Sequence, residues 1–220
     1  MAIPDFLKGE VVSLDTETAV LGDHVIELGL SVFRDAALVY EWGTYIKPVI
    51  PIDPECTKIH NIQDKDVESS PMFADIAPIL LNYLKSADLL VAYNYDYDRG
   101  VLGNEFTRLG IQFPVKPMVD PFIWFKQWHK YEKGKKLVKA AEVYGVQYVG
   151  AHRAVNDATA TGKVLMKMAA TKTDFPRDIK SCMKKQRKMI EDQFEDLQAY
   201  FIKIGKGKIN PPNYQFYDVV

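Results

Sequence analysis

The order of the periodic segments constrains this chain most, because strand-like runs come first and helix-like runs dominate afterwards. Residues 11–14, 25–33 and 38–46 are rich in β-branched and apolar side chains. The turn Asp35-Ala36-Ala37 between the second and third runs is short enough for an antiparallel hairpin. The chain is therefore expected to begin with three consecutive strands.

Helical spacing of apolar residues begins after the extended, proline-containing connection at residues 48–54, which is expected to lack regular structure. Ser70 and Pro71 form an N-cap and first-turn pair. The spacing predicts helices over residues 70–84, 97–109, 121–129, 135–144 and 155–170, and strands over residues 88–93 and 117–119. Strands first and alternating elements afterwards indicate an α/β fold.

The composition changes near residue 171, after which strand character is absent. Apolar residues then recur at steps of four and three, which draws one stripe along a long helix: Ile190, Phe194, Leu197, Phe201 and Ile204. The sequence predicts a domain at residues 1–170 and a helical C-terminal extension at residues 171–220. The extension either docks on that domain, pairs with a second copy or binds another protein, so monomer and homodimer both remain open.

Charge and cysteine content exclude several classes of protein. The chain has 28 basic and 29 acidic residues, so nucleic-acid binding would need a local patch or a bound metal. Two cysteines far apart in sequence argue against a disulfide scaffold or a zinc module. The N-terminus does not resemble a secretion signal and no run approaches 18 apolar residues. We expect a cytoplasmic protein without a membrane partner.

Asp15 and Glu17 lie two residues apart at the end of the first apolar strand. Such a spacing projects both side chains from one face of a strand. Carboxylates that face the same way repel each other, and Mg²⁺ or Mn²⁺ relieves that repulsion while taking hard oxygen ligands. The pair therefore indicates a metal site, although two solvated acids at a strand end would give the same pattern.

Two later segments carry further acids at the starts of predicted helices. Asp98 follows the strand at residues 88–93, and His152 precedes Asp157 by five residues. Each has an ordinary explanation, since acids suit helix N-termini and a histidine can be structural. Together, however, four carboxylates can hold two divalent ions about 3.5 to 4 Å apart for phosphodiester hydrolysis. A neutral imidazole can act as the general base in such a site.

Three ordered motifs then carry a family resemblance: Ser13–Thr18, Val91–Asp98 and His152–Ala158. Over residues 8–170 the chain resembles the DEDDh 3′–5′ exonucleases, similar to the epsilon proofreading subunit of DNA polymerase III, within the ribonuclease H-like superfamily. The resemblance implies a mixed central sheet of about five strands flanked by helices. It also implies two Mg²⁺ or Mn²⁺ ions per site, His152 as the general base, and four metal ligands: Asp15, Glu17, Asp98 and Asp157.

The resemblance further implies which residues grip the 3′-terminal nucleotide: Thr16, Thr18, His60, Asn94 and Tyr97. Tyr97 would serve equally as a core aromatic and Asn94 as a turn residue. The chain departs from the family at Tyr93, where histidine is common, and at Asn61, where glycine is common. These departures affect the expected substrate preference and leave the metal ligands intact.

The sequence thus predicts a metal-dependent 3′–5′ exonuclease that removes nucleoside 5′-monophosphates from single-stranded or frayed DNA in proofreading or repair. One alternative is an exoribonuclease that trims RNA or short oligonucleotides. Another is a noncatalytic module that binds nucleic-acid ends or a polymerase. The expected partners are DNA or RNA 3′ ends and, through the C-terminal extension, a DNA polymerase or other replication or repair protein. The lysine-rich segment at residues 126–139 is either a phosphate track or a solvated loop.

Overall fold

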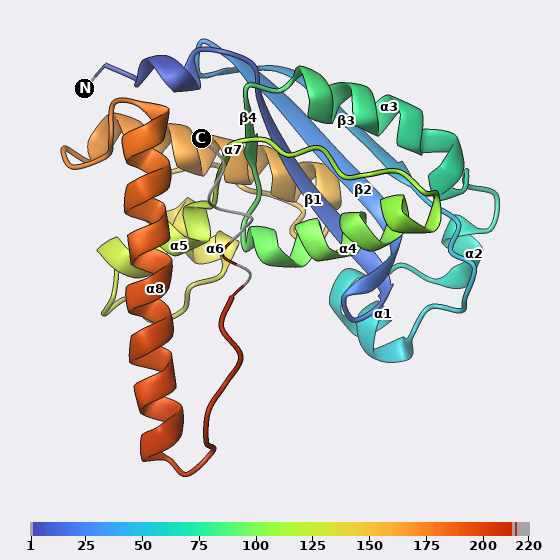
Figure 1. Cartoon of the computed structure of the whole chain (residues 1–220). Coiled ribbons are helices and arrows are strands. Elements are labelled where there is room, and N and C mark those ends of the chain that lie inside the picture. The colour runs from blue at the N-terminus through green and yellow to red at the C-terminus, as the bar shows by residue number, and fades with distance from the viewer. Residues whose placement is uncertain (1, 213, 215–220) are drawn as a thin grey trace.

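The computed structural model describes residues 2–212 and 214 and has a five-stranded sheet in the order β3-β2-β1-β4-β5 (Figure 1). β1 pairs antiparallel with β2, and β2 pairs antiparallel with β3. β4 is parallel to both β1 and β5. The strands are β1 (Val11–Val20), β2 (Asp23–Arg34), β3 (Ala37–Tyr45), β4 (Leu89–Val91) and β5 (Met118–Val119). The prediction of an α/β fold with a mixed five-stranded sheet is confirmed.

Helices cover both faces of the sheet. The α-helices of the described chain are α1 (Pro54–His60), α2 (Asp64–Val67), α3 (Phe73–Ser86), α4 (Tyr95–Arg108), α5 (Pro121–Trp128), α6 (Leu137–Val143), α7 (Ala154–Thr171) and α8 (Ile179–Lys203). Ser13 of β1 and Ser31 of β2 bond to α7 on one face. Thr16 of β1 bonds to α4 on the other face. Ser13 and Thr16, three residues apart, thus point to opposite faces and connect β1 to the helices on both sides of the sheet.

Two glycines let α7 lie close against the sheet. A Cβ added to Gly29 of β2 would lie 2.1 Å from the backbone atoms of Ala154 and Val155. At Gly43 of β3, opposite Gly29 in the sheet, a Cβ would lie 3.1 Å from the Val155 side chain. The start of α7 therefore packs backbone against backbone on β2, a contact that only glycine permits.

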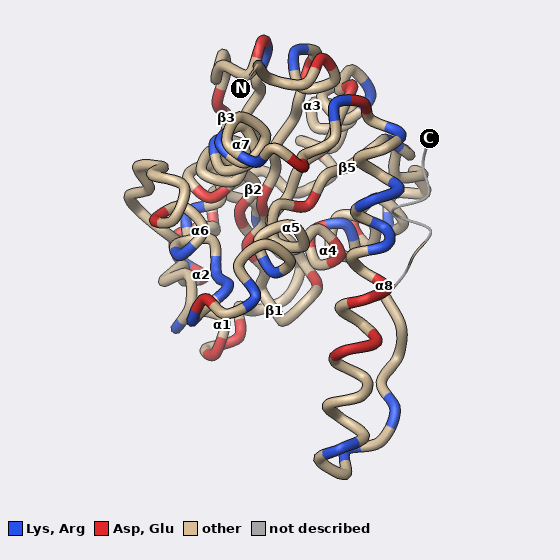
Figure 2. The backbone as a smooth tube through the Cα atoms, turned by 90° about the vertical axis from the view of Figure 1, so that its left-hand side faces the viewer, with Lys and Arg blue, Asp and Glu red and all other residues tan. Residues whose placement is uncertain are grey.

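The long C-terminal helix α8 has a docked half and a projecting half. Gln186 in the docked half is fully buried, and its Oε1 accepts from the Asp120 amide at 2.8 Å and the Trp124 indole at 2.9 Å. Farther along, the helix projects beyond the body in both views (Figure 1 and Figure 2) and exposes apolar side chains. These are Leu197, Tyr200 and Ile202. The single predicted stripe is thus divided between a packed and an exposed environment.

Residues 48–53 lack helix and strand, as predicted, and the helix α1, which was not predicted, starts at Pro54. Asp53 caps that helix by accepting from the Glu55 amide at 2.8 Å, and the Asp53 amide bonds to the Ala19 carbonyl at the end of β1. The predicted Ser70–Pro71 helix start is wrong. α3 starts at Phe73 because Asp75 accepts from the Met72 amide at 2.9 Å.

The predicted division between a domain at 1–170 and an extension at 171–220 stays a prediction, and the last residues of that extension, 215–220, lie outside the described part. α7 ends at Thr171 and α8 begins at Ile179. Across residues 2–212 and 214, none of the helices combines the length and the apolar character needed to cross a lipid bilayer.

Candidate active site

Asp15 and Glu17 lie on β1 just beyond its parallel pairing with β4, which involves only Val11–Ser13. Both acids share a strand face with Ser13, whose hydroxyl donates to the Ala158 carbonyl of α7 at 2.7 Å. This face of β1 is therefore turned toward the beginning of α7. Both side chains are partly exposed, as expected for groups that line a cleft.

Asp98 reaches the same strand from the opposite layer. It lies in the first turn of α4 and is only 3% exposed. Its Oδ1 accepts from the Thr16 amide at 2.9 Å and from the Thr16 hydroxyl at 2.8 Å. These two bonds fix the Asp98 carboxylate beside the main chain between Asp15 and Glu17.

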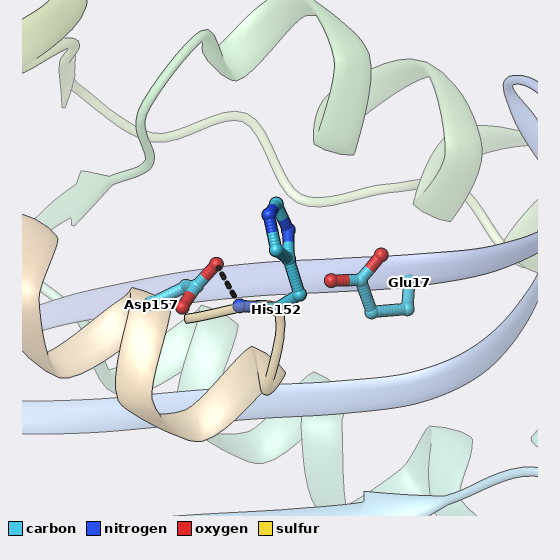
Figure 3. Close-up of side chains that lie close together, drawn as sticks. All are labelled: Glu17, His152 and Asp157. Carbon is cyan, nitrogen blue, oxygen red and sulfur yellow. Dashed lines mark hydrogen bonds between the residues drawn. The ribbon is translucent and has the colours of Figure 1, made fainter. Parts of the chain in front are cut away.

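Asp157 and His152 come from the start of α7 and the loop before it. His152 has a φ of 64°, and its amide lies 3.4 Å from the Asp157 Oδ2 atom (Figure 3). The other carboxylate oxygen of Asp157 accepts from the Tyr148 hydroxyl at 2.5 Å. One potential ligand atom from each of Glu17, His152 and Asp157 lies within 4.8 Å of the other two. His152 and Asp157 of the third motif therefore lie beside Glu17 of the first. Asp98 of the second motif is bonded to Thr16 of the first.

The carboxylates strongly disfavour one another's charged forms. Burial, and then the neighbouring Asp98, Asp157 and Glu17, hold the pKa of Asp15 well above its usual range. Burial and then the charges of Asp157 and Glu27 raise the pKa of Glu17 to about 8. Burial also raises the pKa of Asp98 to about 7. A shared proton or a bound cation is needed to offset this repulsion.

The residues present fit a divalent metal ion. Their donor set consists of carboxylate oxygens, the ligands that Mg²⁺ and Mn²⁺ favour, with one imidazole at the edge. Burial first, and then the charges of neighbouring acids, raise the pKa values of Asp15 and Glu17, and a bound cation would offset both effects. The four acids are the residues that would hold the ion.

A cleft with a volume of about 480 Å³ opens over these groups. Its lining includes Asp15, His152 and Asp157, together with Tyr148. The remaining lining residues are Tyr93, Asn94, Phe122, Lys135, Lys136, Leu137 and Val138. The cleft thus combines acidic, aromatic and basic groups, as a nucleotide requires.

Three of the residues predicted to grip the substrate are bonded to other parts of the protein. The Thr18 and Tyr97 hydroxyls share a hydrogen bond of 2.8 Å, and the Gly22 amide donates to the Tyr97 oxygen at 3.1 Å. His60 is 3% exposed, and its Nδ1 accepts from the Ile62 amide while Nε2 faces the Thr18 carbonyl at 3.3 Å. Substrate contact by these side chains stays a prediction.

The other two take different places. Thr16 positions Asp98, as described above, and is 5% exposed. Asn94 lines the cleft and has a left-handed φ of 70°. The amides of Asn94 and Tyr95 donate to the buried Asp120, both at 3.0 Å. Asp120 thereby holds the turn that leads into α4 and Asp98.

Sequence reasoning missed Tyr148 and Glu27. Tyr148 lies in an irregular segment without periodicity, and Glu27 interrupts an otherwise apolar strand. Glu27 lies directly opposite Glu17 in the β1–β2 ladder, accepts from the Ala154 amide at 3.3 Å and lies 3.9 Å from Arg153. A charged residue within a largely apolar strand was the signal that could have pointed to Glu27. In the structure Glu27 lies against the start of α7.

The lysine-rich segment is partly structural. The Lys135 ammonium donates to the carbonyls of His129 at 2.6 Å and Glu132 at 2.5 Å, which closes the loop before α6. Lys139 pairs with Glu132 and Glu142. Lys136 is exposed and lines the cleft, so it is the lysine of this segment best placed to meet a phosphate.

Comparison with known proteins agrees with this geometry. Residues 12–165 match the exonuclease family RNase_T. The chain is 31% identical over 165 residues to DNA polymerase III PolC-type of Caldanaerobacter subterraneus subsp. tengcongensis, an alignment that covers 74% of this chain and 12% of the relative. It is 27% identical over 157 residues to the 3′-5′ exonuclease DinG of Staphylococcus aureus strain USA300, which covers 71% of this chain and 17% of DinG.

The chain therefore spans less than a fifth of the length of these two relatives. Among solved structures, Exonuclease X in complex with 5′ overhanging duplex DNA aligns with a TM-score of 0.61 at 20% identity. That alignment covers 73% of this chain and 92% of the other. At this level of identity the likeness concerns the fold.

Proposed function

This chain belongs to the exonuclease family RNase_T, and from that premise we propose that it is a metal-dependent 3′–5′ exonuclease acting on single-stranded or frayed DNA. The observation that carries the proposal is the meeting of Asp15 and Asp157 in one cleft, with Asp98 bonded to Thr16 next to Asp15 and with the pKa values of all three carboxyls raised. Acids accumulate in this way where a cation and a phosphate must be bound together.

The proposed chemistry assigns separate tasks to the residues. Asp15, Glu17, Asp98 and Asp157 would hold the divalent ions, which when bound would activate a water and stabilise the leaving oxygen. His152 takes the proton of the attacking water because its exposed imidazole lies beside the acids at the open side of the cleft. Tyr148 and Thr16 orient Asp157 and Asp98 through the hydrogen bonds described above.

DNA as the substrate is supported by the names of the relatives and by the DNA in the Exonuclease X complex. A proofreading role would require preference for unpaired 3′ ends. If the protein binds a polymerase, we expect the polymerase to contact the exposed apolar side chains of α8, which are Leu197, Tyr200 and Ile202. This association stays a prediction.

The test uses 5′-labelled DNA and RNA of one sequence, with Mg²⁺ or Mn²⁺ and a chelator control. We expect a ladder that shortens from the 3′ end of DNA, stops with chelator and is faster at a mispaired end than at a paired end. Faster shortening of RNA would move the protein to the exoribonucleases. Absence of cleavage of either strand would reject the proposed activity.

A further inference from the structure

A second, smaller pocket continues from the cleft toward the projecting half of α8. It lies between α5 and α8 and has a volume of about 120 Å³. Asn94 and Phe122 line both this pocket and the cleft that holds the acids. The two pockets therefore adjoin at Asn94 and Phe122, and the second pocket is a neighbour of the place where the proposed function puts the 3′ end.

The walls of this pocket suit one flat aromatic ring. Phe122 and Phe194 contribute aromatic surface, Leu197 and Pro212 contribute aliphatic surface, and the small volume excludes a larger ligand. Bases of single-stranded nucleic acids bind to such surfaces by stacking, without regard to sequence. The apolar walls thus match a nucleobase better than they match a sugar or phosphate.

Polar groups at the rim add to this match. The Gln193 amide donates to the Ile123 carbonyl at 2.9 Å, while its Oε1 has no hydrogen-bond partner in the described part of the chain. The Lys126 ammonium lies 4.2 Å from the centre of the Phe122 ring and offsets the charges of Asp96 and Asp120. Because Lys126 offsets these two acids, they do not prevent an uncharged base from binding in the pocket.

The α8 side of the pocket lies outside residues 12–165, the part that matches the exonuclease family. Gln193, Phe194 and Leu197 are among the α8 residues of this lining. The α8 wall of the pocket is therefore not part of the segment that matches the family.

We infer that the pocket between α5 and α8 binds a nucleobase of the substrate strand upstream of the scissile phosphate. This inference rests on the proposed function for the position of the 3′ end. It makes α8 part of the substrate site, so strands long enough to reach the pocket bind more tightly than mononucleotide substrates.

The test compares two aspartate substitutions on the same helix. Leu197 is 46% exposed and lines the pocket, whereas Tyr200 is 55% exposed and is not among the pocket's lining residues. Both substitutions add the same charge at an exposed position, so both variants should fold. In an Asp15→Asn background that keeps the strand intact, Leu197→Asp should weaken binding of a single-stranded 12-mer about tenfold, and Tyr200→Asp by less than about twofold.

An abasic scan identifies the base. DNA and RNA oligomers with one base removed at successive positions from the 3′ end should show one upstream position where removal weakens binding about tenfold. At that position Leu197→Asp should cause no further loss, because base and pocket wall act together. Equal effects of the two aspartates, or independent losses from base removal and Leu197→Asp, would overturn the inference.

Failure of the proposed function gives a different result. A nucleoside 5′-p-nitrophenyl phosphate has no upstream base, so its hydrolysis by the unsubstituted protein reports on the acids alone and not on the pocket. If the unsubstituted protein hydrolyses neither this ester nor an oligomer, the exonuclease proposal fails. The binding comparison still decides whether the pocket takes a base.

Discussion

Two glutamates near the opposite ends of β1 have opposite electrostatic environments. Glu10 precedes the strand, and its carboxylate accepts from Arg34 at 2.6 Å and from the Ser86 hydroxyl at 2.5 Å. The hydrogen bonds from Ser86 and Arg34 hold the pKa of Glu10 below its usual range. Glu17 lies among other acids, and burial and their charges raise its pKa to about 8.

A surface pocket lies near each end of β1, and the two pockets differ in volume and in the charge of the groups around them. The hollow at Glu10, which Arg34, Tyr40 and Tyr83 also line, has a volume of about 580 Å³. It is larger than the cleft of about 480 Å³ at the acids. Volume alone would select the wrong end of the strand. Under the proposed function the crowded acids mark the catalytic end, because a bound cation would neutralise their charge there.

The largest difference is expected when one carboxylate charge is removed at each end of β1. Asp15→Asn should lower turnover at least about a thousandfold because the metal loses a ligand. The same change should raise the melting temperature of the metal-free protein, since it relieves repulsion. Glu10→Gln should leave turnover within about twofold and lower stability by about 1 kcal/mol. Nuclease assays and thermal unfolding measure both, and similar turnover in the two variants would contradict the assignment.

His152 tests whether the catalytic end contains a base as well as ligands. His152→Asn should lower turnover by about a hundredfold or more, while a calorimetric titration still detects metal binding. Asparagine suits this site because it tolerates the left-handed backbone at φ 64°. His24→Asn is the matched control, since His24 also has a positive φ of 56° and lies outside the cleft. Unchanged turnover of His152→Asn would remove it from the mechanism.

Tyr148→Phe sharpens the comparison by removing one hydrogen bond from the acidic end. Without the Tyr148 hydroxyl, the Asp157 carboxylate loses its 2.5 Å partner. Turnover at low metal should fall about two- to tenfold and recover in part at high metal. Tyr144→Phe, which breaks a 3.0 Å bond to His129 instead, is the control. A loss that is independent of metal concentration would argue against a positioning role.

The pH dependence of stability should show the smallest effect. The folded-state pKa values of Glu17, about 8, and Asp98, about 7, lie above those of an unfolded chain. The metal-free folded protein therefore binds more protons, and its stability falls as pH rises from about 5 to 8. We expect a melting temperature lower by about 5 °C across this range.

Saturating Mg²⁺ should reduce this fall, since the ion replaces the lost protons. Glu10 has the opposite sign, because its lowered pKa gives stability that is lost on acidification. Scanning calorimetry with chelator and with metal measures the difference. A melting temperature that does not change with pH in the metal-free protein would contradict the crowding of the acids.

Much of the fold could be predicted because its elements are long and periodic. The second and third strands and the helix at 154–171 have regular apolar patterns, and the structure has them within two residues, whereas β1 continues six residues beyond the predicted 11–14 through mostly polar residues. α1 and α2 were missed because they have only seven and four residues, too few for a helical period. Their positions depend on tertiary bonds such as that from Asp53 to Ala19.

The site was predictable to the extent that its residues lie in ordered motifs. The acids and His152 stand in three short segments that resemble one family. Tyr148 and Asp120 stand in none of them, and only folding brings their side chains to Asp157 and to the turn at Asn94. The pocket formed with α8 was equally inaccessible, because the stripe predicted from sequence does not show where the helix leaves the body.

The backbone contact at Gly29 has a mechanical consequence. With no side chain between β2 and the beginning of α7, no rotamer change can absorb a displacement of one relative to the other. The backbone of β2 and the first turn of α7, which carries Asp157, are therefore held at a fixed separation, and a larger residue at position 29 would push Asp157 away from the strand acids.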